Sequence, residues 1–433
     1  MKTSYPKDKI RVVLAEGVHA AAVDRLKDEG FAVETIAGAP SSAKLRALLG
    51  SAHVLGIRSK TSVLAEHLAS APRLLAIGCF CIGTDQVDLL SARGAGVAVF
   101  NSPFSNTRSV AELTLAEIIA LHRRIPVKNI AMHAGTWDKS ASGAHEVRGR
   151  TLGIVGYGHI GAQVSVLAEA IGMRVIFHDV VPKLALGNAR PVRSLADLLK
   201  EADVVTLHVP DEPSTRKLIT TAHLKKMKRG SILINNARGA VVDIPAVADA
   251  IKSGHLAGAA FDVFPSEPSA KDEPFESELR GLPNVLLTPH IGGSTEEAQE
   301  AIGLDVAEKL VRFINVGATT GAVNVPQVDL AEQPTPHPTP VATAGAGTPP
   351  PPPPPPRPHR ILYFHRNVPG VLGSVHRVIA EVGANISAEH LRTEGDLGYV
   401  ILDVDPTSGG GKSTKVLEKL REIPETVRLR ILW

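Results

Sequence analysis

The sequence is poor in cysteine, in excess charge and in long apolar runs, and each shortage narrows the class of protein. Its 433 residues contain two cysteines, Cys79 and Cys81, too close along one expected strand for an ordinary bridge. We therefore expect buried core thiols rather than a redox or metal site. A formal net charge of +3 is too small to indicate nucleic acid or a membrane as partner. No apolar leader opens the chain and no apolar run reaches about 18 residues, so we expect a soluble cytoplasmic protein.

Apolar residues, by contrast, make up 44% of the chain, enough for the cores of two or three domains. The strongest motif follows a predicted buried strand that ends near Val155. Gly156, Gly158 and Gly161 have the spacing G-x-G-x-x-G and lead into a helix predicted over residues 162–172. In the dinucleotide fingerprint these glycines allow a tight turn, a close pyrophosphate and close packing of helix on strand. The helix N-terminus adds free N–H groups and a positive dipole end for the phosphates.

A carboxylate follows this motif at the spacing that a ribose ligand requires. Asp179 ends the next predicted strand, 18 residues after Gly161. It can accept hydrogen bonds from the ribose hydroxyl groups, and its charge repels a 2′-phosphate. The sequence therefore favours NAD over NADP.

The first hundred residues also alternate between strands and helices. Strands are predicted over residues 9–14, 52–57, 74–77 and 97–100, and a helix over residues 20–30. Arg58, Ser59 and Lys60 follow the second of these strands, and ligands of open α/β sheets gather at the carboxyl ends of strands. Cations and hydroxyl groups there suit an anionic group, but a solvated loop explains the same residues. The pattern alone leaves both interpretations open.

A second α/β domain follows the loop Asn101–Arg108. Asn106 either caps the helix predicted over residues 109–123 or points its amide into a cleft. Further strands are predicted near residues 152–155, 174–178, 203–207, 231–235, 257–261 and 285–288. Strands that alternate with helices in this way are typical of a parallel, doubly wound sheet.

Three ionisable residues lie at or near the ends of the later strands. Arg238, Glu267 and His290 each have an ordinary interpretation, as a surface cation, a loop acid and a loop histidine. Together they provide what 2-hydroxyacid chemistry needs. A histidine can take the hydroxyl proton near neutral pH, and a carboxylate bonded to it fixes its tautomer and raises its basicity. A guanidinium can bind the substrate carboxylate in bidentate fashion. The joint placement favours this function.

The last 140 residues change character twice. Ser294–Glu297 matches a capping box and opens a helix predicted to residue 316, which returns the chain to the first domain. Residues 331–359 hold thirteen of the 32 prolines, including eight in a row from Pro349. That run predicts a polyproline II spacer of about 25 Å, with a ligand for proline-reading domains as the alternative.

Residues 360–433 are predicted to form a small separate unit. Strands are expected over residues 361–365, 384–392, 398–404 and 426–432, with helices over residues 371–382 and 413–422. The order βαββαβ is that of a ferredoxin-like fold. Two asparagines of this unit, Asn367 and Asn385, have an ordinary interpretation as turn and cap residues.

Taken together, these motifs resemble the NAD-dependent D-isomer-specific 2-hydroxyacid dehydrogenases, over nearly the whole chain. The narrower resemblance is to the short, serine-inhibited bacterial branch, with a C-terminal ACT domain. It is carried by the stretches 56–61, 77–83, 101–112, 155–161 and 287–294. It implies a discontinuous substrate-binding domain, an NAD-binding domain, a linker and an ACT domain, over residues 1–107 with 295–330, 108–294, 331–359 and 360–433.

The resemblance also implies roles for individual residues. The catalytic residues would be Arg238, Glu267 and His290. The cofactor contacts would be Gly156, Gly158, His159, Ile160, Gly161, Asp179, Asn236, Ala237, Arg238, Asp262, His290, Ile291, Gly292 and Gly293. The phosphorylated substrate would contact Arg58, Ser59, Lys60, Asn106 and Lys139. The effector serine would contact His365, Asn367 and Asn385.

The activity that the resemblance implies is oxidation of 3-phospho-D-glycerate by a homotetramer, with NAD as cofactor and feedback by L-serine. The alternatives are another D-2-hydroxyacid dehydrogenase, acting on hydroxypyruvate, D-lactate or 2-hydroxyglutarate, and an NAD-sensing binding protein of the same fold. The sequence departs from its relatives at Ala37, where they carry a lysine, and in its 29-residue linker, where they have a short glycine hinge. A long linker transmits orientation poorly, so we expect weak serine inhibition that strengthens when Gln333–Pro356 is trimmed.

Overall fold

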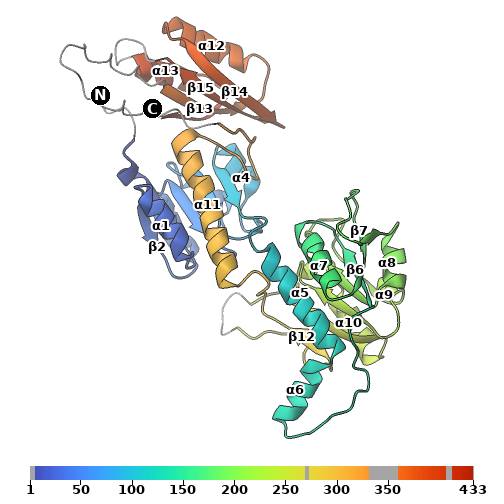
Figure 1. The fold of residues 1–433 in the computed structure, drawn as a ribbon. Coiled ribbons are helices and arrows are strands. Elements are labelled where there is room, and N and C mark those ends of the chain that lie inside the picture. The colour runs from blue at the N-terminus through green and yellow to red at the C-terminus, as the bar shows by residue number, and fades with distance from the viewer. Residues whose placement is uncertain (1–4, 269–272, 331–358, 406–411, 433) are drawn as a thin grey trace, which may run out of the picture. The chain divides into compact units, whose positions relative to one another are not determined.

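The structure, a computed structural model, describes residues 5–268, 273–330, 359–405 and 412–432. Contacts divide the chain into two compact units, Met1–Pro103 with Glu300–Trp433 and Phe104–Gln299. Two parallel sheets and one antiparallel sheet, each with helices, make up the fold (Figure 1). The predicted fold class is therefore confirmed. Within the described ranges, no helix is long and apolar enough to cross a membrane.

The first sheet is parallel, with the strand order β2-β1-β3-β4-β5. Its strands are β1 (Arg11–Leu14), β2 (Ala32–Thr35), β3 (Val54–Ile57), β4 (Ala76–Cys79) and β5 (Ala98–Asn101). Its helices are η1 (Lys7–Lys9), α1 (Ala20–Asp28), α2 (Ser42–Leu49), α3 (Ala65–Ala69), α4 (Leu89–Gly94) and α11 (Glu296–Val316). Strand order reverses beside β1, so β1 and β3 end at the switch point where ligands of such sheets bind.

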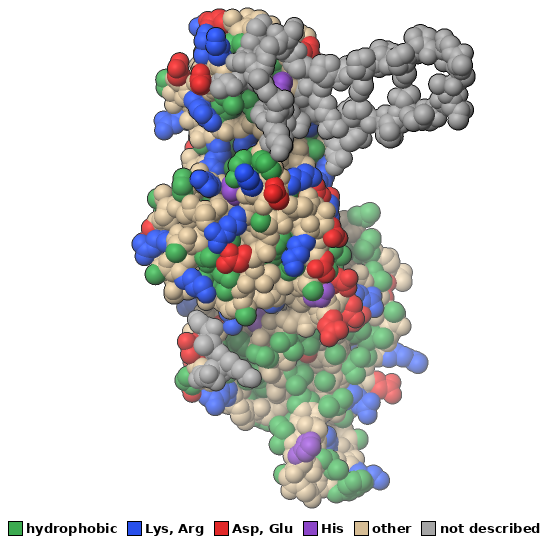
Figure 2. Space-filling model, turned by 90° about the vertical axis from the view of Figure 1, so that its left-hand side faces the viewer, with side chains coloured by type: hydrophobic (Ala, Val, Ile, Leu, Met, Phe, Trp, Pro, Cys, Tyr) green, Lys and Arg blue, Asp and Glu red, His purple; other side chains and the backbone are tan. Residues whose placement is uncertain are grey.

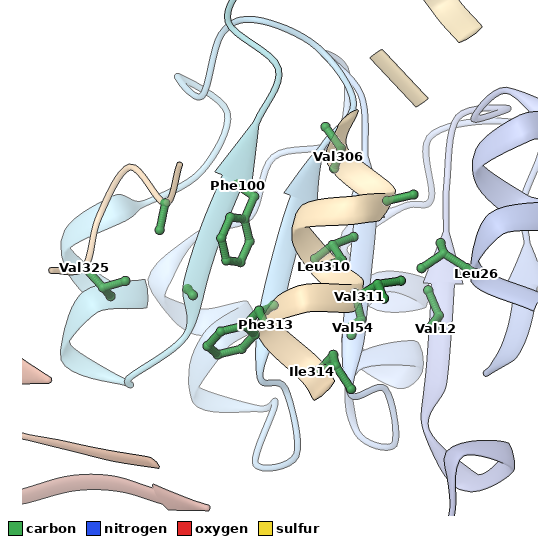
Figure 3. Packing of buried hydrophobic residues seen from close by; sticks show 14 of the residues in the cluster. Val12, Leu26, Val54, Phe100, Val306, Leu310, Val311, Phe313, Ile314 and Val325 are labelled. Carbon is green, nitrogen blue, oxygen red and sulfur yellow. The ribbon is translucent and has the colours of Figure 1, made fainter. Parts of the chain in front are cut away.

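Strands β1, β3, β4 and β5 have short apolar sequences because helices cover both faces of the sheet. Val12 and Val54 face the layer that contains α1 and α11, where Phe313 lies 5.6 Å from Phe100 between ring centroids (Figure 3). Leu55 and the other alternate residues face α2, α3 and α4. Helix α11 thus supplies one side of the core of this sheet.

The second sheet is also parallel and has the order β12-β11-β10-β9-β6-β7-β8. Its strands are β6 (Thr151–Val155), β7 (Arg174–His178), β8 (Arg190–Pro191), β9 (Val204–Leu207), β10 (Ser231–Asn235), β11 (Leu256–Phe261) and β12 (Val285–Leu287). Its helices are α5 (Thr107–His122), α6 (Ile125–His133), α7 (His159–Ala170), α8 (Leu195–Glu201), α9 (Thr221–Leu224), η2 (Gly239–Val241) and α10 (Ile244–Lys252). The order reverses between β6 and β9, which places the glycine turn after β6 at the switch point.

The C-terminal sheet is antiparallel, with the order β14-β15-β13-β16. Its elements are β13 (His359–Arg366), α12 (Val371–Glu381), β14 (Ile386–Glu394), β15 (Leu397–Val404), α13 (Lys412–Arg421) and β16 (Thr426–Leu432). The predicted βαββαβ order is confirmed. Except for His359, the predicted linker lies outside the described residues.

Both faces of this antiparallel sheet are covered. Tyr363 and the residues that alternate with it pack against α12 and α13. Phe364, Tyr399 and their neighbours join the core that contains α11, and Tyr399 donates a hydrogen bond of 2.7 Å to the carbonyl of Gly317. The C-terminal domain therefore packs directly on the first α/β layer, although a long stretch of sequence separates them.

Several local expectations from the sequence are corrected. The short strand β2 and helix α6 were not predicted, because β2 is mostly exposed and α6 buries none of its side chains. Strand β4 ends at Cys79, so Cys81 lies beyond it and is only partly buried, and neither cysteine forms a disulfide. Helix α11 is capped by Thr295, whose hydroxyl accepts from the N–H of Ala298, rather than by Ser294. The four-domain boundaries proposed from the sequence stay a prediction.

Candidate active site

The glycine turn after β6 has the shape that a dinucleotide needs. Gly156 has a φ of +91°, and a Cβ on it would overlap the carbonyl of His208. A Cβ on Gly161 would overlap the carbonyl of Gly156, so α7 packs closely on the turn. Gly158 caps α7, and an added Cβ there would meet nothing within 4 Å. The turn therefore presents the N-terminus of α7, which begins at His159, to open space.

Asp179 lies directly after β7 and is bonded to the same turn. Its Oδ2 accepts from the backbone N–H of Tyr157 at 2.8 Å, and its Oδ1 accepts from that of Val181 at 3.0 Å. The carboxylate is thereby fixed beside the turn, where a ribose ligand belongs. These residues fit a bound NAD.

His290 and Glu267 form a hydrogen-bonded pair. His290 Nδ1 lies 2.8 Å from Glu267 Oε2, and the other oxygen of Glu267 accepts from the N–H of Phe264 at 3.1 Å. The backbone of His290 has a φ of +56°, which non-glycine residues rarely adopt. The His290 side chain is 52% exposed, so its free Nε2 side is open to a substrate.

Electrostatics tune this pair as a base. The hydrogen bond to Glu267 raises the pKa of His290, against the effect of burial. Burial would raise the pKa of Glu267, but the bond from His290 and its charge outweigh this effect and lower it. The positive charge of Arg238 acts to lower the pKa of both His290 and Glu267, although the net shift of His290 is upward. The guanidinium therefore lies in the same electrostatic neighbourhood. The structure thus brings Arg238, Glu267 and His290 together.

The turn that carries His290 is held by Asp262, at the end of β11. Its carboxylate accepts from the hydroxyl of Thr288 at 2.6 Å and from the N–H groups of Ile291 and Gly292 at 2.8 and 2.7 Å. Asp262 is buried, with 2% of its surface exposed. In this structure it positions the turn that carries His290.

The two asparagines of this unit that were predicted to contact ligands differ from the simplest expectation. Asn106 makes no capping hydrogen bond to α5, and its amide packs against Gly293. Its Oδ1 is buried and has no partner within the described ranges. The Asn236 side chain is turned inward toward Thr114 and Glu117. A cofactor contact by Asn236 would therefore come from its backbone.

In the other unit, the loop Arg58–Thr61 is supported by a residue that sequence reasoning missed. The carboxylate of Glu16, after β1, accepts from the N–H groups of Arg58, Lys60 and Thr61 at 3.2, 2.9 and 2.8 Å. Glu16 has a φ of +67° and is only 9% exposed. Hydrogen bonds therefore hold the backbone of this loop in place, and Ser59 and the two cationic side chains lie on its outer surface. Only the adjacency of β1 and β3 in the sheet reveals this support.

Lys139 is exposed in the loop that follows α6. No contact described in the structure joins it to Arg238, Glu267 or His290. The same segment exposes large apolar side chains, with Ile130 69% and Trp137 74% exposed. Figure 2 shows apolar side chains gathered over the part of the unit from which α6 projects.

The predicted effector residues do not form one cluster within the chain. Asn367 donates to the carbonyl of Gly395 at 2.9 Å, before β15, whereas Asn385 donates to Asp405 at 3.0 Å, after β15. The eight residues of β15 separate them by about 23 Å, at roughly 3.3 Å per residue. His365 lies near Asn367, with its Nε2 buried and without a described partner. A second copy of the domain would be needed to join both ends.

Within the described ranges, no group of three or more histidine, cysteine, aspartate or glutamate side chains is placed to hold a metal ion.

Two family descriptions match the sequence. "D-isomer specific 2-hydroxyacid dehydrogenase, NAD binding domain" matches residues 115–292, and "AHAS small subunit-like ACT domain" matches residues 361–428. Curated relatives match over the whole length. The D-3-phosphoglycerate dehydrogenases of Dictyostelium discoideum and Haemophilus influenzae are each 48% identical to this chain, over 100% of it and 99% of their own length.

A solved structure agrees on the fold and cofactor. The D-lactate dehydrogenase of Aquifex aeolicus, complexed with NAD and lactic acid, aligns with a TM-score of 0.64 at 28% identity. The alignment covers 73% of this chain and 100% of that one. The second parallel sheet and its glycine turn are thus an NAD-binding domain, as the sequence predicted.

Removing the imidazole should abolish most turnover. His290→Ala is expected to lower kcat for 2-hydroxyacid oxidation by about 10² to 10⁴, the usual contribution of a general base, and to leave NAD affinity unchanged. Wild-type kcat/KM should fall as pH drops through the raised pKa of His290, because the imidazolium cannot accept a proton. Glu267→Gln should move this acid limb to lower pH and reduce the limiting rate. Steady-state kinetics across pH would test both, with exposed Glu276→Gln as control; near-normal turnover of His290→Ala would exclude the assignment.

Asp179→Ala should weaken NAD binding and narrow the preference for NAD over NADP, because both the ribose acceptor and its charge are lost. Dissociation constants of the two cofactors, measured by fluorescence titration, check this expectation. Our interpretation of Asp179 would be wrong if the wild type already bound NADP as tightly as NAD.

Proposed function

Because the chain belongs to the D-3-phosphoglycerate dehydrogenase family, whose members are NAD-dependent 2-hydroxyacid dehydrogenases, we propose that it oxidises 3-phospho-D-glycerate to 3-phosphohydroxypyruvate. This reaction opens serine biosynthesis. The observation that carries the proposal is the full-length match to enzymes of that name. The hydrogen-bonded loop Arg58–Thr61 supports it, because a phosphorylated acid needs a second anion-binding site beyond the one for its carboxylate.

His290 acts as the general base in this proposal. Its Nδ1 is occupied by Glu267, so Nε2 accepts the proton of the C2 hydroxyl group. Glu267 holds the ring in the tautomer that leaves Nε2 free and stabilises the imidazolium that forms. In the direction of reduction, the same nitrogen returns the proton to the oxygen.

NAD, when bound, supplies the acceptor for the C2 hydride. The chain holds it through the N-terminus of α7, the carboxylate of Asp179 and the turns that follow β10 and β12. Arg238 lies after β10 and binds the substrate carboxylate, which fixes the orientation of C2. Arg58, Ser59 and Lys60 bind the phosphate, with Asn106 and Lys139 as further contacts.

Other 2-hydroxyacids remain the alternative substrates. The Arg238–Glu267–His290 set serves any of them equally well, so it does not select the phosphorylated acid. Selection depends on the cationic loop after β3, because an unphosphorylated acid such as 2-hydroxyglutarate has no phosphate for this loop to bind.

We also propose a homo-oligomer, with a homotetramer as its form. Ile130, Trp137 and neighbouring apolar side chains of the α6 segment are exposed, and a partner copy would bury them. The opposite placement of Asn367 and Asn385 on the C-terminal sheet supports a second contact between copies. Cys79 and Cys81 form no disulfide, which fits a reducing compartment, and we propose the cytoplasm.

L-Serine is the proposed effector of the ACT domain. Histidine and asparagine side chains offer donors for a carboxylate and acceptors for an ammonium group. In edge-to-edge pairing of two copies, His365 and Asn367 of one copy would meet Asn385 of the other. The site would then form only in the oligomer.

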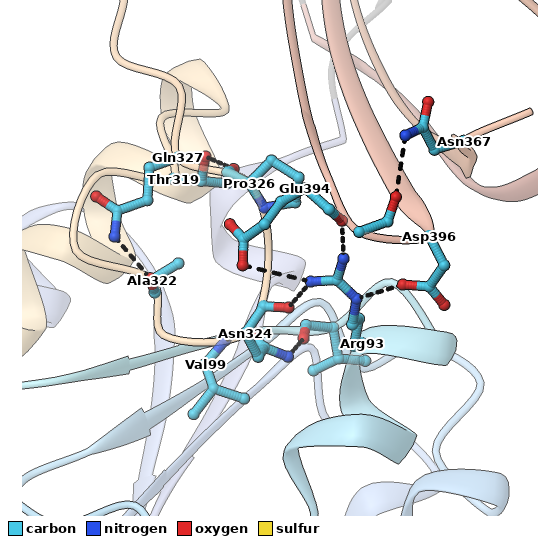
Figure 4. A network of polar contacts seen from close by, with 12 residues as sticks. Arg93, Val99, Thr319, Ala322, Asn324, Pro326, Gln327, Asn367, Glu394 and Asp396 are labelled. Carbon is cyan, nitrogen blue, oxygen red and sulfur yellow. Dashed lines mark hydrogen bonds and ion pairs between the residues drawn. The ribbon is translucent and has the colours of Figure 1, made fainter.

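A direct route leads from this domain to the first sheet. The Nε of Arg93, on α4, donates to Asp396 at 2.9 Å, and another nitrogen donates to the carbonyl of Glu394 (Figure 4). The same guanidinium donates to the carbonyl of Asn324 at 2.9 Å. Asn324 in turn bonds the backbone of Val99 on the edge strand β5, at 2.8 Å.

Arg93 thus fastens the β14–β15 hairpin, which Asn367 also contacts, to the strand that leads into the Asn106 loop. This route does not pass through residues 331–358. The sequence led us to expect weak coupling between the ACT domain and the first sheet through a long linker. We propose instead that the two are coupled through these direct contacts. Serine can change catalysis by this route if its binding shifts the hairpin.

Arg58→Ala should raise the apparent KM for 3-phospho-D-glycerate by about tenfold or more, and that for 2-hydroxyglutarate much less, because only the first carries a phosphate. Steady-state kinetics with both acids provide the measurement, and Arg46→Ala on α2 is a charge-matched control. An equal loss for both acids would assign Arg58 a structural role.

Arg93→Ala should leave serine binding intact and make inhibition at saturating serine less complete, because the hairpin loses its fastening to β5. Asn385→Ala should abolish the response by removing part of the site. Trimming Gln333–Pro356 should change inhibition little. Calorimetry and inhibition curves on the intact protein test all three; full inhibition of Arg93→Ala, or inhibition strengthened by trimming, would contradict the docking route.

A further inference from the structure

A buried carboxyl group lies beneath the cofactor side of the second sheet and has no part in the chemistry above. Glu117, on α5, is 3% exposed. Its Oε2 accepts from the side-chain amide of Asn236 at 2.7 Å. The second amide hydrogen of Asn236 goes to the hydroxyl of Thr114 at 3.0 Å, and this hydroxyl donates to the carbonyl of Val110. The amide nitrogen is thus fully used.

Two oxygens of this pair remain unsatisfied. Glu117 Oε1 and Asn236 Oδ1 are both buried, and neither has a hydrogen-bond partner among the residues that the structure describes. Both are acceptors when Glu117 is ionised, so they cannot satisfy each other. Buried polar atoms without partners are costly, about 1–3 kcal/mol each. One proton on Oε1 would turn it into a donor and could satisfy both atoms at once.

We infer that Glu117 is held as a neutral carboxylic acid, which donates its proton to Asn236 and so positions the turn that carries Ala237 and Arg238. Acid and amide then form a ring of two hydrogen bonds: the amide N–H to Oε2, and the Oε1–H to Oδ1. Glu117 is a positioning residue in this scheme, because it touches neither substrate nor cofactor. The inference depends on the NAD site and is independent of which 2-hydroxyacid is the substrate.

The surroundings favour the neutral form. Burial raises the pKa of Glu117, the bond from Asn236 lowers it in part, and the charge of Asp262 raises it again, so that the pKa is about 8. Asp262 is the charged group whose field bears on Glu117. The elements packed around this part of α5 carry these other ionisable groups: Glu112 and His122 on α5, Lys128 and His133 on α6, His159 and Glu169 on α7, and Arg238, Glu267 and His290 after β10, β11 and β12.

Ionisation of Glu117 would disturb two turns. It would break the bond to Asn236 Oδ1, next to Ala237 and Arg238. It would also set a second negative charge near Asp262, which holds Ile291 and Gly292 beside His290. The proton therefore keeps both cofactor-side turns in place, and its loss at alkaline pH should weaken cofactor binding.

The test compares Glu117→Gln, an isosteric neutral amide, and Glu117→Ala with the intact wild type. The dissociation constant of NAD for the wild type should rise above about pH 8. This alkaline rise should be absent in Glu117→Gln, whereas Glu117→Ala should bind NAD about tenfold more weakly at every pH. Exposed Glu112→Gln, on the same helix, is the matched control and should keep the alkaline rise.

Infrared difference spectroscopy gives a readout independent of cofactor and turnover. The wild type at pH 7 should show the carbonyl band of a protonated carboxylic acid, and Glu117→Gln should lack it. Thermal unfolding adds a second. The folded pKa lies above the unfolded one, so the neutral form stabilises the fold fully at low pH and this contribution is lost as pH rises to about 8. The Tm of Glu117→Gln relative to wild type should therefore increase by a few degrees over that interval.

A missing carboxylic-acid band, with equal alkaline behaviour of wild type and Glu117→Gln, would overturn the inference. If Glu117→Ala failed to fold, the comparison of wild type with Glu117→Gln would still decide it. Failure of the proposed substrate assignment would leave the band, the Tm difference and the NAD titration unaffected.

Discussion

Backbone N–H groups at the carboxyl ends of strands must find acceptors, and the site depends on how this chain supplies them. Loops that follow buried strands cannot use the ladder hydrogen bonds of the sheet. In this chain, carboxylates accept these hydrogen bonds. Glu16 does so for the loop after β3, Asp179 for the glycine turn, and Asp262 for the turn that carries His290. Each supports a loop that presents functional side chains. In each unit, negative charge beneath a loop is accompanied by cations on the same part of the chain: Arg58 and Lys60 on the loop that Glu16 supports, and Arg238 near the turn that Asp262 supports.

This arrangement explains why the catalytic pair can be exposed and still ordered. His290 and Glu267 are half-exposed and bonded to each other, so neither is held by deep burial. The rigidity comes from buried Asp262, which accepts from the side-chain hydroxyl of Thr288 before His290 and from the backbone N–H of Gly292 after it. A strained φ at His290 persists because that network over-determines it.

Much of the fold and of the site follows from local sequence patterns, and the rest depends on contacts between distant residues. Buried parallel strands, the glycine fingerprint and the βαββαβ order are local signals, and their predictions are confirmed. Glu16 and Arg93 had no such signal, because their partners lie 42 or more and about 300 residues away. Exposed elements such as α6 lack the apolar periodicity that predicts a helix. One local signal was overlooked: Ile361–Phe364 is continuously apolar, which indicates a strand buried on both faces. The roles of individual site residues stay predictions.

The double burial of the C-terminal sheet has a consequence for how this regulatory domain can be inherited. A ferredoxin-like sheet usually needs only its own two helices, and its other face can meet water or any partner. Here Phe364, Tyr399 and their neighbours belong to the same apolar cluster as α11, so the sheet completes its core only against this host. The isolated domain would expose an apolar surface. If it were moved to another enzyme, that enzyme would need a complementary apolar surface. The long proline-rich insertion is thus free to vary in length, whereas the docking face must evolve together with α11.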